Sequence, residues 1–208
     1  MPAIRPVQRA LLVLIAAATA LSYVGASWPR DLTLHHIGTA AGFAGLVWTT
    51  RRAPLTDTSF AALTAFLLLH VLAAHWLYSF VPYDRWTEAI LGVNVTEAFG
   101  FRRNHFDRVV HLAFGALVVG PVREVLTGRA GLRRGWARVL AIDLVLSTSA
   151  VYELIEWGVA LAADPVHAER YNGQQGDFFD AQKDMGMAAL GAVAATLADA
   201  VLARRRTS

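Results

Sequence analysis

Six long apolar runs, separated by short stretches that carry most of the charge, limit what this chain can fold into. The runs cover roughly residues 9–27, 33–50, 59–81, 106–126, 138–162 and 184–203. An α-helix needs about 20 mostly apolar residues to cross the hydrocarbon core of a bilayer. We therefore predict an all-α polytopic membrane protein, in which residues 1–208 form a single domain, a bundle of six transmembrane helices.

The composition favours a membrane protein over a soluble one. Hydrophobic residues make up 55% of the chain and charged residues only 17%, and the mean hydropathy is +0.41. Soluble domains carry about 25% charged residues. The net charge of +3 comes from short basic clusters between the apolar runs, a pattern typical of cytoplasmic loops, so we expect no nucleic-acid partner. The chain has no cysteine, which excludes disulfides and thiolate ligands.

The first apolar run also has features of a secretory signal peptide. Arg5 and Arg9 precede its apolar stretch, and the small residues 25–27 lie near its end. We expect a retained helix, because the apolar run is long for a signal peptide.

The distribution of arginine and lysine predicts how the helices are oriented. The termini and loops of one side hold Asp57 as their one acid and eleven basic residues: Arg5, Arg9, Arg51, Arg52, Arg129, Arg133, Arg134, Arg138, Arg204, Arg205 and Arg206. The loops of the other side hold seven basic residues among ten acids. Basic residues are enriched in cytoplasmic loops. We therefore expect a multi-pass protein of the bacterial inner membrane with both termini in the cytoplasm.

The third run contains two histidines and a tyrosine near its outer end. His75 and Tyr78 are three residues apart and would share one face of a helix, while His70 lies deeper and is rotated away from that face. This spacing favours His75 as a metal ligand and Tyr78 as a substrate contact. The alternative is that these histidines only form hydrogen bonds with neighbouring helices.

The fourth run opens with the motif Asn104-His105-Phe106-Asp107-Arg108, and His111 follows one turn later. Asp107 and Arg108 lie four and three residues before His111, so a carboxylate, a guanidinium and an imidazole lie close together at the helix start. We predict Asp107 and His111 as metal ligands and Arg108 as an anion contact for a substrate. Alternatively, Asp107 caps the exposed N–H groups of the helix.

The fifth run carries Glu153 and Glu156 in its outer half, three residues apart on one face. Two carboxylates this close repel each other unless a cation, a proton or an arginine lies between them. An exposed pair would be unremarkable, but this pair lies inside an apolar run. We predict both glutamates as catalytic acid–base groups.

Three aspartates, Asp177, Asp180 and Asp184, lead into the sixth run. If the helix begins near Asp177, their spacing places them along one face. We predict Asp180 as a catalytic residue, Asp177 and Asp184 as metal ligands, and Gln182 and Lys183 as substrate contacts. An acidic helix start, favoured by the helix dipole, would explain Asp177 and Asp180 but explains Asp184 poorly.

All of these motifs fall at the outer ends or outer halves of four predicted helices, which indicates one shared site. Carboxylates and imidazoles without thiols suit a divalent ion such as Mg, Mn, Zn or Fe. The chain contains no His-Glu-x-x-His run and no pair of Glu-x-x-His motifs. A metal-free network of carboxylates with arginine, lysine and histidine is an alternative, and so is the proton relay of a transporter. Near the inner ends of the helices, Arg123 and Asp143 are predicted to form a separate structural pair.

These motifs resemble the YjdF-type family of bacterial inner-membrane proteins. The resemblance is carried by His70 through Tyr78, Asn104-His105-Phe106-Asp107-Arg108-x-x-His111, Tyr152-Glu153-x-x-Glu156-Trp157 and Gln175-Gly176-Asp177-x-x-Asp180-Ala181-Gln182-Lys183-Asp184-Met185. It implies a polytopic membrane protein and supplies no established activity. The last two runs are more distantly similar to VanZ-like proteins, although Asp184 stands where an asparagine is expected. The aspartate run is also similar to that of CDP-alcohol phosphotransferases, but their Gly-x-x-Ala-Arg is missing here.

The sequence thus predicts a metal- or polar-headgroup-binding site that acts on a lipid or envelope-linked substrate; it does not identify a cofactor, for which a divalent metal ion is the candidate. Membrane lipids are the expected partners. Whether the protein is an enzyme is left open, because a proton-coupled transporter and a non-catalytic lipid-binding or assembly protein are both alternatives. The sequence does not predict an oligomeric state.

Overall fold

The computed structural model describes residues 4–205, which are all-helical apart from turns and loops and contain no strand. Arg206, one of the basic residues used above to orient the helices, lies outside the described residues. The helices are α1 (Pro6–Leu21), α2 (Pro29–Arg52), α3 (Asp57–His75), α4 (Tyr83–Leu91), α5 (Val95–Ala98), α6 (Phe106–Gly128), α7 (Arg134–Ala162), α8 (Pro165–Asn172) and α9 (Asp180–Arg205).

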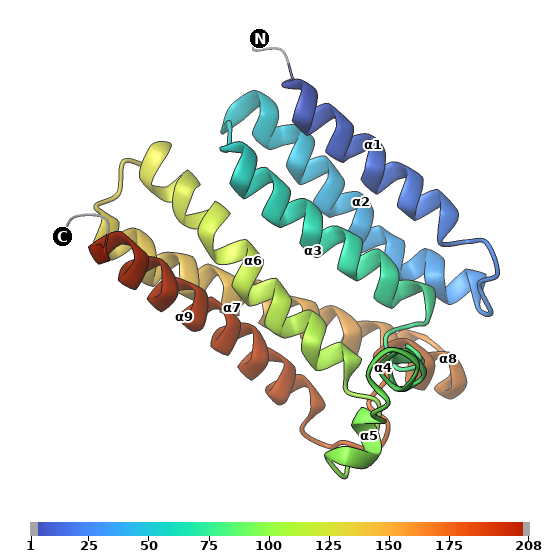
Figure 1. Cartoon of the computed structure of the whole chain (residues 1–208). Helices are drawn as coiled ribbons and strands as arrows, with labels where there is room; N and C mark the ends of the chain where they lie inside the picture. The colour runs from blue at the N-terminus through green and yellow to red at the C-terminus, as the bar shows by residue number, and fades with distance from the viewer. Residues whose placement is uncertain (1–3, 206–208) are drawn as a thin grey trace.

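The long helices α1, α2, α3, α6, α7 and α9 run alongside one another (Figure 1). Helix α1 begins and helix α9 ends at the same end of the bundle. The short helices α4, α5 and α8 lie at the opposite end. Helices α1–α3 pack together, α6, α7 and α9 pack together, and contact between α3 and α6 joins the two groups. Each predicted run therefore overlaps one long helix, although α1 ends at Leu21, well before the predicted end near residue 27.

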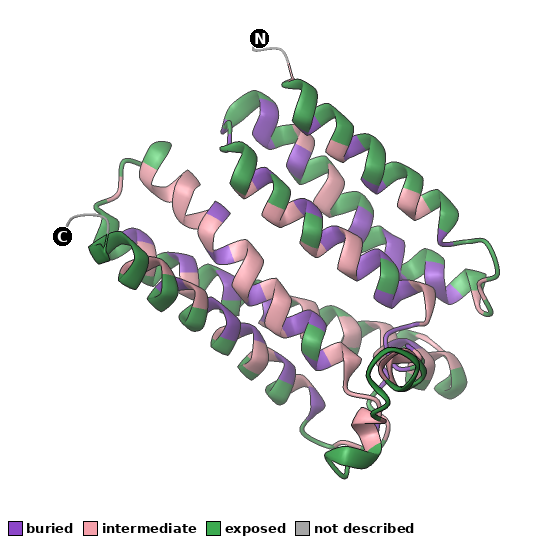
Figure 2. Cartoon of the chain, in the orientation of Figure 1, coloured by how far each residue is buried: buried purple, intermediate pink, exposed green. Residues whose placement is uncertain are grey.

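Three helices of the described part of the chain, α3, α6 and α9, are long and apolar enough to cross a membrane, and α1 is a shorter apolar helix. Many large apolar side chains point outward, among them Ile37, Trp48, Leu154 and Leu197. Figure 2 shows such exposed positions along the outer faces of the long helices. An outer surface this apolar is unsuited to water and suits contact with lipid.

The third helix ends earlier than the sequence predicted. It was expected to reach residue 81, but α3 stops at His75, and the φ angles of Leu77 and Tyr78 are positive, at 46° and 59°. The Tyr78 N–H donates to the Ala73 carbonyl at 2.8 Å and the Leu77 N–H to the Ala74 carbonyl at 2.9 Å, which together form a Schellman turn. The prediction that His75 and Tyr78 share a helical face is therefore wrong.

Helices α6 and α9 are in direct backbone contact through two glycines. A Cβ atom added to Gly115 would lie 1.9 Å from the Ala188 carbonyl oxygen, and one added to Gly191 would lie 2.1 Å from that of Leu112. Small residues permit this close approach of membrane helices. Nearer the chain termini, Arg123 Nη1 lies 2.9 Å from Asp199 Oδ2 and adds an ion pair between the same helices. The predicted partner of Arg123, Asp143, is therefore wrong.

Candidate functional site

Two neighbouring groups of charged side chains lie at the end of the bundle that carries α4, α5 and α8. The first, which we call the ion-paired cluster, consists of Arg103, Arg108, Asp177, Asp180 and Lys183. The second, which we call the carboxylate cluster, consists of Asp107, His111, Glu153, Glu156 and Asp184. Both draw on the start of α6 and the start of α9, and α7 adds the two glutamates.

The acids of the ion-paired cluster are compensated by nearby cations. Asp180 accepts hydrogen bonds from Arg103 and, at 2.6 Å, from Arg108, and all three side chains are less than a tenth exposed. Asp177 accepts from Arg108 at 3.0 Å and from Lys183 at 2.7 Å. The hydrogen bond from Lys183 lowers the pKa of the Asp177 carboxyl. Three cations therefore face two acids, and no additional cation is needed for charge balance.

Arg103 also anchors the loop between α8 and α9. Its guanidinium donates to the carbonyl oxygens of Gln174 at 2.9 Å and Gly173 at 3.2 Å. Beside it, the Asn104 N–H donates to the Gln175 side-chain oxygen at 2.9 Å. Gly173 has a φ of 62°, and a Cβ there would lie 2.1 Å from the Ser79 hydroxyl oxygen, so this position requires glycine. The polar motifs before α6 and α9 thus bind directly to each other.

In the carboxylate cluster, the acids outnumber the nearby cations. His111 Nε2 lies 3.6 Å from Asp107 Oδ1 and 3.8 Å from Glu153 Oε1. One ligand atom from each of Asp107, His111 and Asp184 lies within 4.8 Å of the others, and we call these three residues the triad. Arg108 Nε approaches Asp184 Oδ1 only to 3.9 Å. Four carboxylates therefore share one imidazole and the edge of one guanidinium.

Two carboxylate oxygens of this cluster are buried without a hydrogen-bond partner among the described residues, Asp184 Oδ1 and Glu153 Oε1. The side chains of Asp184 and Glu153 are 3% and 10% exposed. A buried carboxylate without a partner is costly unless a proton or a cation neutralises it. The cluster is therefore suited to taking up a cation.

Tyrosine hydroxyls surround the acids on the side of α8 and the loop after α3. Burial, with a further contribution from Glu156, raises the pKa of Tyr171 to about 12. Burial, together with Asp107 and Glu156, also raises the pKa of Tyr78 well above its ordinary value. Both hydroxyls therefore keep their protons at neutral pH.

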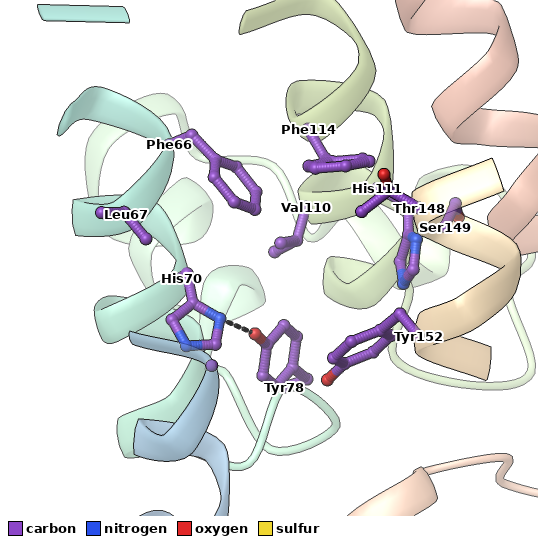
Figure 3. Close-up of a pocket in the computed structure, with 11 residues that line it drawn as sticks. Phe66, Leu67, His70, Tyr78, Val110, His111, Phe114, Thr148, Ser149 and Tyr152 are labelled. Carbon is purple, nitrogen blue, oxygen red and sulfur yellow. Dashed lines mark hydrogen bonds between the residues drawn. The ribbon is translucent and has the colours of Figure 1, made fainter. Parts of the chain in front are cut away.

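A cavity of about 160 Å³ lies on the α3 side of the carboxylate cluster, between α3, α6 and α7 (Figure 3). Its wall is mainly apolar, with Phe66, Val110 and Phe114, and His111 lines its edge. The Tyr78 hydroxyl donates to His70 Nδ1, shown by the dashed line in Figure 3, and His70 Nε2 lies 3.2 Å from the His35 carbonyl oxygen. The histidine is fully engaged in these contacts.

A groove of about 830 Å³ lies on the other side of the carboxylate cluster, between α7, α8 and α9. Its polar wall includes Glu153, Glu156 and Asp180, and its apolar wall includes Trp157 and Phe178. Glu153 belongs both to this wall and to the carboxylate cluster. The groove therefore connects the outer surface of α7 with the neighbourhood of the triad.

The structure brings together some of the residues that were predicted as one site and separates others. Asp107, His111 and Asp184 form the triad, and Glu153, Glu156 and Gln182 line the groove beside it. By contrast, Asp177, Asp180, Arg108 and Lys183 are bound to one another. Tyr78 contacts His70, and His75 Nδ1 lies 2.6 Å from the Ser22 carbonyl oxygen, so His75 faces the end of α1.

Arg103 was missed as a site residue, although it is among the most buried charged side chains of the site. The signal available in the sequence was the pair Arg102-Arg103 in a loop of the predicted acid-rich side. A second missed contact fixes α8, because Asp31 at the start of α2 lies 3.0 Å from both His167 Nδ1 and Arg170 Nη1. The His35 ring also stacks on Tyr171, with centroids 4.6 Å apart.

Comparison with known proteins gives a family and no activity. Residues 7–205 match the family described as "Predicted membrane protein (DUF2238)". The chain is 34% identical over 149 residues, 71% of its length, to "Inner membrane protein YjdF" of Escherichia coli (strain K12), of which the match covers 67%. No solved structure matches. The chain is thus a relative of YjdF and belongs to the DUF2238 family of predicted membrane proteins.

Proposed function

We propose that this protein crosses the inner membrane six times, with both termini in the cytoplasm, and that its carboxylate cluster binds a divalent cation at the extracytoplasmic end. The six long helices and the basic residues of the loops on the terminal side support this topology, and the relative YjdF, an inner membrane protein, supports the location. α2 and α7 would be the two spans that carry most polar residues. Intramembrane acids and histidines of this kind usually face the bundle interior and serve a function.

The observation that carries the cation site is the triad. Asp107 and His111 are one turn apart on α6, and Asp184 reaches the same point from α9, so that three ligand atoms lie within 4.8 Å of one another. Carboxylate oxygens and an imidazole nitrogen suit Mg, Mn, Zn or Fe, and a bound divalent ion would also neutralise the excess negative charge of the cluster. Glu153 Oε1, 3.8 Å from the His111 ring, is placed beside such an ion.

The reaction class that we propose is metal-assisted chemistry on a lipid or envelope-linked substrate. A divalent ion can polarise a substrate oxygen or lower the pKa of a bound water. Glu153 and Glu156 would then transfer protons beside the triad, and the groove would admit the substrate from the lipid side of α7. Asp180 is excluded from this role, because two arginines hold it.

The metal content of the purified protein tests the site. We expect about one divalent ion per wild-type chain, and less than a tenth of that after Asp107→Asn or Asp184→Asn, because each removes a ligand. Asp177→Asn is the matched control, since it removes a neighbouring carboxylate outside the triad and should retain the ion. If the wild-type protein contains no divalent ion after purification and binds none when it is added, the proposed cation site is contradicted.

Labelling of single cysteines tests the topology, because the native chain contains none. Glu88 on α4 and Arg129 after α6 are both exposed. In intact cells with a permeable outer membrane, a membrane-impermeant maleimide should label Glu88→Cys and leave Arg129→Cys unlabelled until the cells are lysed. The reverse pattern would invert the proposed orientation, and labelling of both would contradict the span count.

A further inference from the structure

We propose that the groove between α7, α8 and α9 binds a membrane lipid whose headgroup carries a primary ammonium group. This inference names the substrate class of the proposed site and rests on the proposed function only in placing the lipid beside the triad. The groove itself is defined without the triad, since none of Asp107, His111 and Asp184 lines it. The lipid would enter sideways from the bilayer.

The polar wall of the groove offers carboxyl groups and hydrogen-bond acceptors. Glu153 and Glu156 project into it from α7, and Asn172 closes it at the end of α8. Glu153 Oε1 and Asn172 Oδ1 are both buried and have no hydrogen-bond partner among the described residues. Glu153 is also nine-tenths buried, so its oxygen has little access to bulk water. A ligand that supplies several N–H donors and a positive charge would satisfy both atoms.

The cations near the groove do not line its wall. No lysine or arginine is among the described residues that line the groove. Arg103 and Arg108 lie behind Asp180 and donate to that carboxylate and to Asp177, and the exposed Lys183 donates to Asp177. A phosphate at the groove floor would therefore meet Glu153 and Glu156 first. Charge complementarity favours an ammonium group at this depth.

The apolar wall identifies the ligand as a lipid instead of a free amine. Leu154, Trp157 and Ala160 on α7 face Phe178 and Met185 across the groove. Leu154, Trp157 and Phe178 are more than half exposed, and Val151, Ile155 and Leu161 on α7 are exposed and apolar as well. This continuous apolar surface leads from the acids to the outer face of the bundle. An acyl chain can follow it while the headgroup stays at the glutamates.

Lipid add-back to the delipidated full-length protein tests the proposal. Equimolar phosphatidylethanolamine, phosphatidylcholine and phosphatidylglycerol with identical acyl chains are offered in the presence of EDTA, and bound lipid is counted by native mass spectrometry. Phosphatidylethanolamine should be retained about tenfold over the other two, because choline has no N–H donor and glycerol has no positive charge. Equal retention of the three lipids, or a preference for phosphatidylglycerol, would overturn the proposal.

Three variants locate the binding. Glu153→Gln should remove the preference for phosphatidylethanolamine, and Glu156→Gln, a second test should the first variant not fold, should reduce it. Ala160→Phe should obstruct the apolar wall and lower retention of all three lipids. Glu88→Gln is the matched control, an exposed outer-end glutamate outside the groove. A preference that survives both glutamate substitutions contradicts the proposed site.

Two further measurements separate this inference from the proposed function and from a soluble ligand. Metal content is determined on the same wild-type preparation before EDTA is added. If the protein prefers phosphatidylethanolamine but takes up no metal, the lipid site is supported and the metal site at the triad is contradicted. If it takes up metal but shows no lipid preference, the metal site is supported and the lipid site is contradicted. Free ethanolamine at the lipid concentration should not displace the bound lipid. Full displacement would mean that the ligand is a soluble amine, which overturns the lipid assignment.

Discussion

The ion-paired cluster and the carboxylate cluster are built from neighbouring residues and have opposite charge balance. Arg108 directly follows Asp107 on α6, and Asp184 lies one turn after Asp180 on α9. Yet Asp180 is held by two arginines, while Asp184 Oδ1 is buried without a hydrogen-bond partner among the described residues. The protein neutralises Asp180 with its own arginines and leaves Asp184 to be neutralised by a bound ligand. The charge balance fits a structural role for the ion-paired cluster and the proposed cation site for the carboxylate cluster.

The largest effect should come from Asp180→Asn, which removes an acid from the ion-paired cluster. The variant removes one of the two carboxylates that the buried guanidinium groups of Arg103 and Arg108 share, and Asp177 remains. Removing one partner of a buried ion pair costs about 3–5 kcal/mol. We expect a large drop in the unfolding temperature of the detergent-purified protein. An unchanged unfolding temperature would show that the cluster does not hold the fold.

The next largest effect should come from adding metal, which tests the unbalanced side. An ion at a hundred times its dissociation constant stabilises the folded state by about 2.7 kcal/mol. The unfolding temperature of EDTA-treated wild-type protein should therefore rise when a divalent ion is added, and that of Asp184→Asn should not. A similar rise in both proteins would place the ion outside the triad.

A smaller effect, of opposite sign to that of Asp180→Asn, is expected for Asp184→Asn without metal. The substitution removes one of four crowded carboxylates and so relieves part of their mutual repulsion. The metal-free variant should be as stable as the metal-free wild type or more stable, measured as the unfolding temperature in EDTA. Destabilisation as large as that of Asp180→Asn would show that the two clusters do not differ in kind.

The smallest effect is expected for Lys183→Ala, which removes an exposed member of the ion-paired cluster. Its hydrogen bond lowers the pKa of Asp177, so the stability that it contributes is present at neutral pH and is lost as the pH falls through that lowered pKa. Exposed ion pairs contribute little. The unfolding temperatures of variant and wild type should differ slightly at pH 7 and converge in acid. A difference that grows in acid would contradict this assignment.

The helices themselves could be predicted from the sequence, because long apolar runs leave few choices in a membrane. The end of α3 could not. Schellman turns usually place glycine at the position with positive φ, and here Leu77 occupies it, so the apolar pattern continues past the turn without a signal. That turn moves Tyr78 out of the helix and brings its hydroxyl to His70, and His75 faces α1 instead.

The presence of a carboxylate and histidine cluster followed from the spacing of the motifs, but its division into two did not. Asp177, Asp180 and Asp184 look equivalent in the sequence, and α9 begins only at Asp180. Their different surroundings depend on Arg103, which arrives from a loop more than 70 residues earlier in the chain. Such a tertiary contact leaves no periodic trace, so the sequence assigned Asp177 to a metal and Asp180 to catalysis without showing the arginines that bind them.

The backbone contact at Gly115 and Gly191 limits how the site can open. Because α6 and α9 touch there, these helices have no room to approach further, and the triad bridges them about two turns away. A ligand is thus expected to reach the triad past the glutamates of α7, where only side chains have to move. Helices α6 and α9 would then keep their spacing while the side chains of α7 move aside.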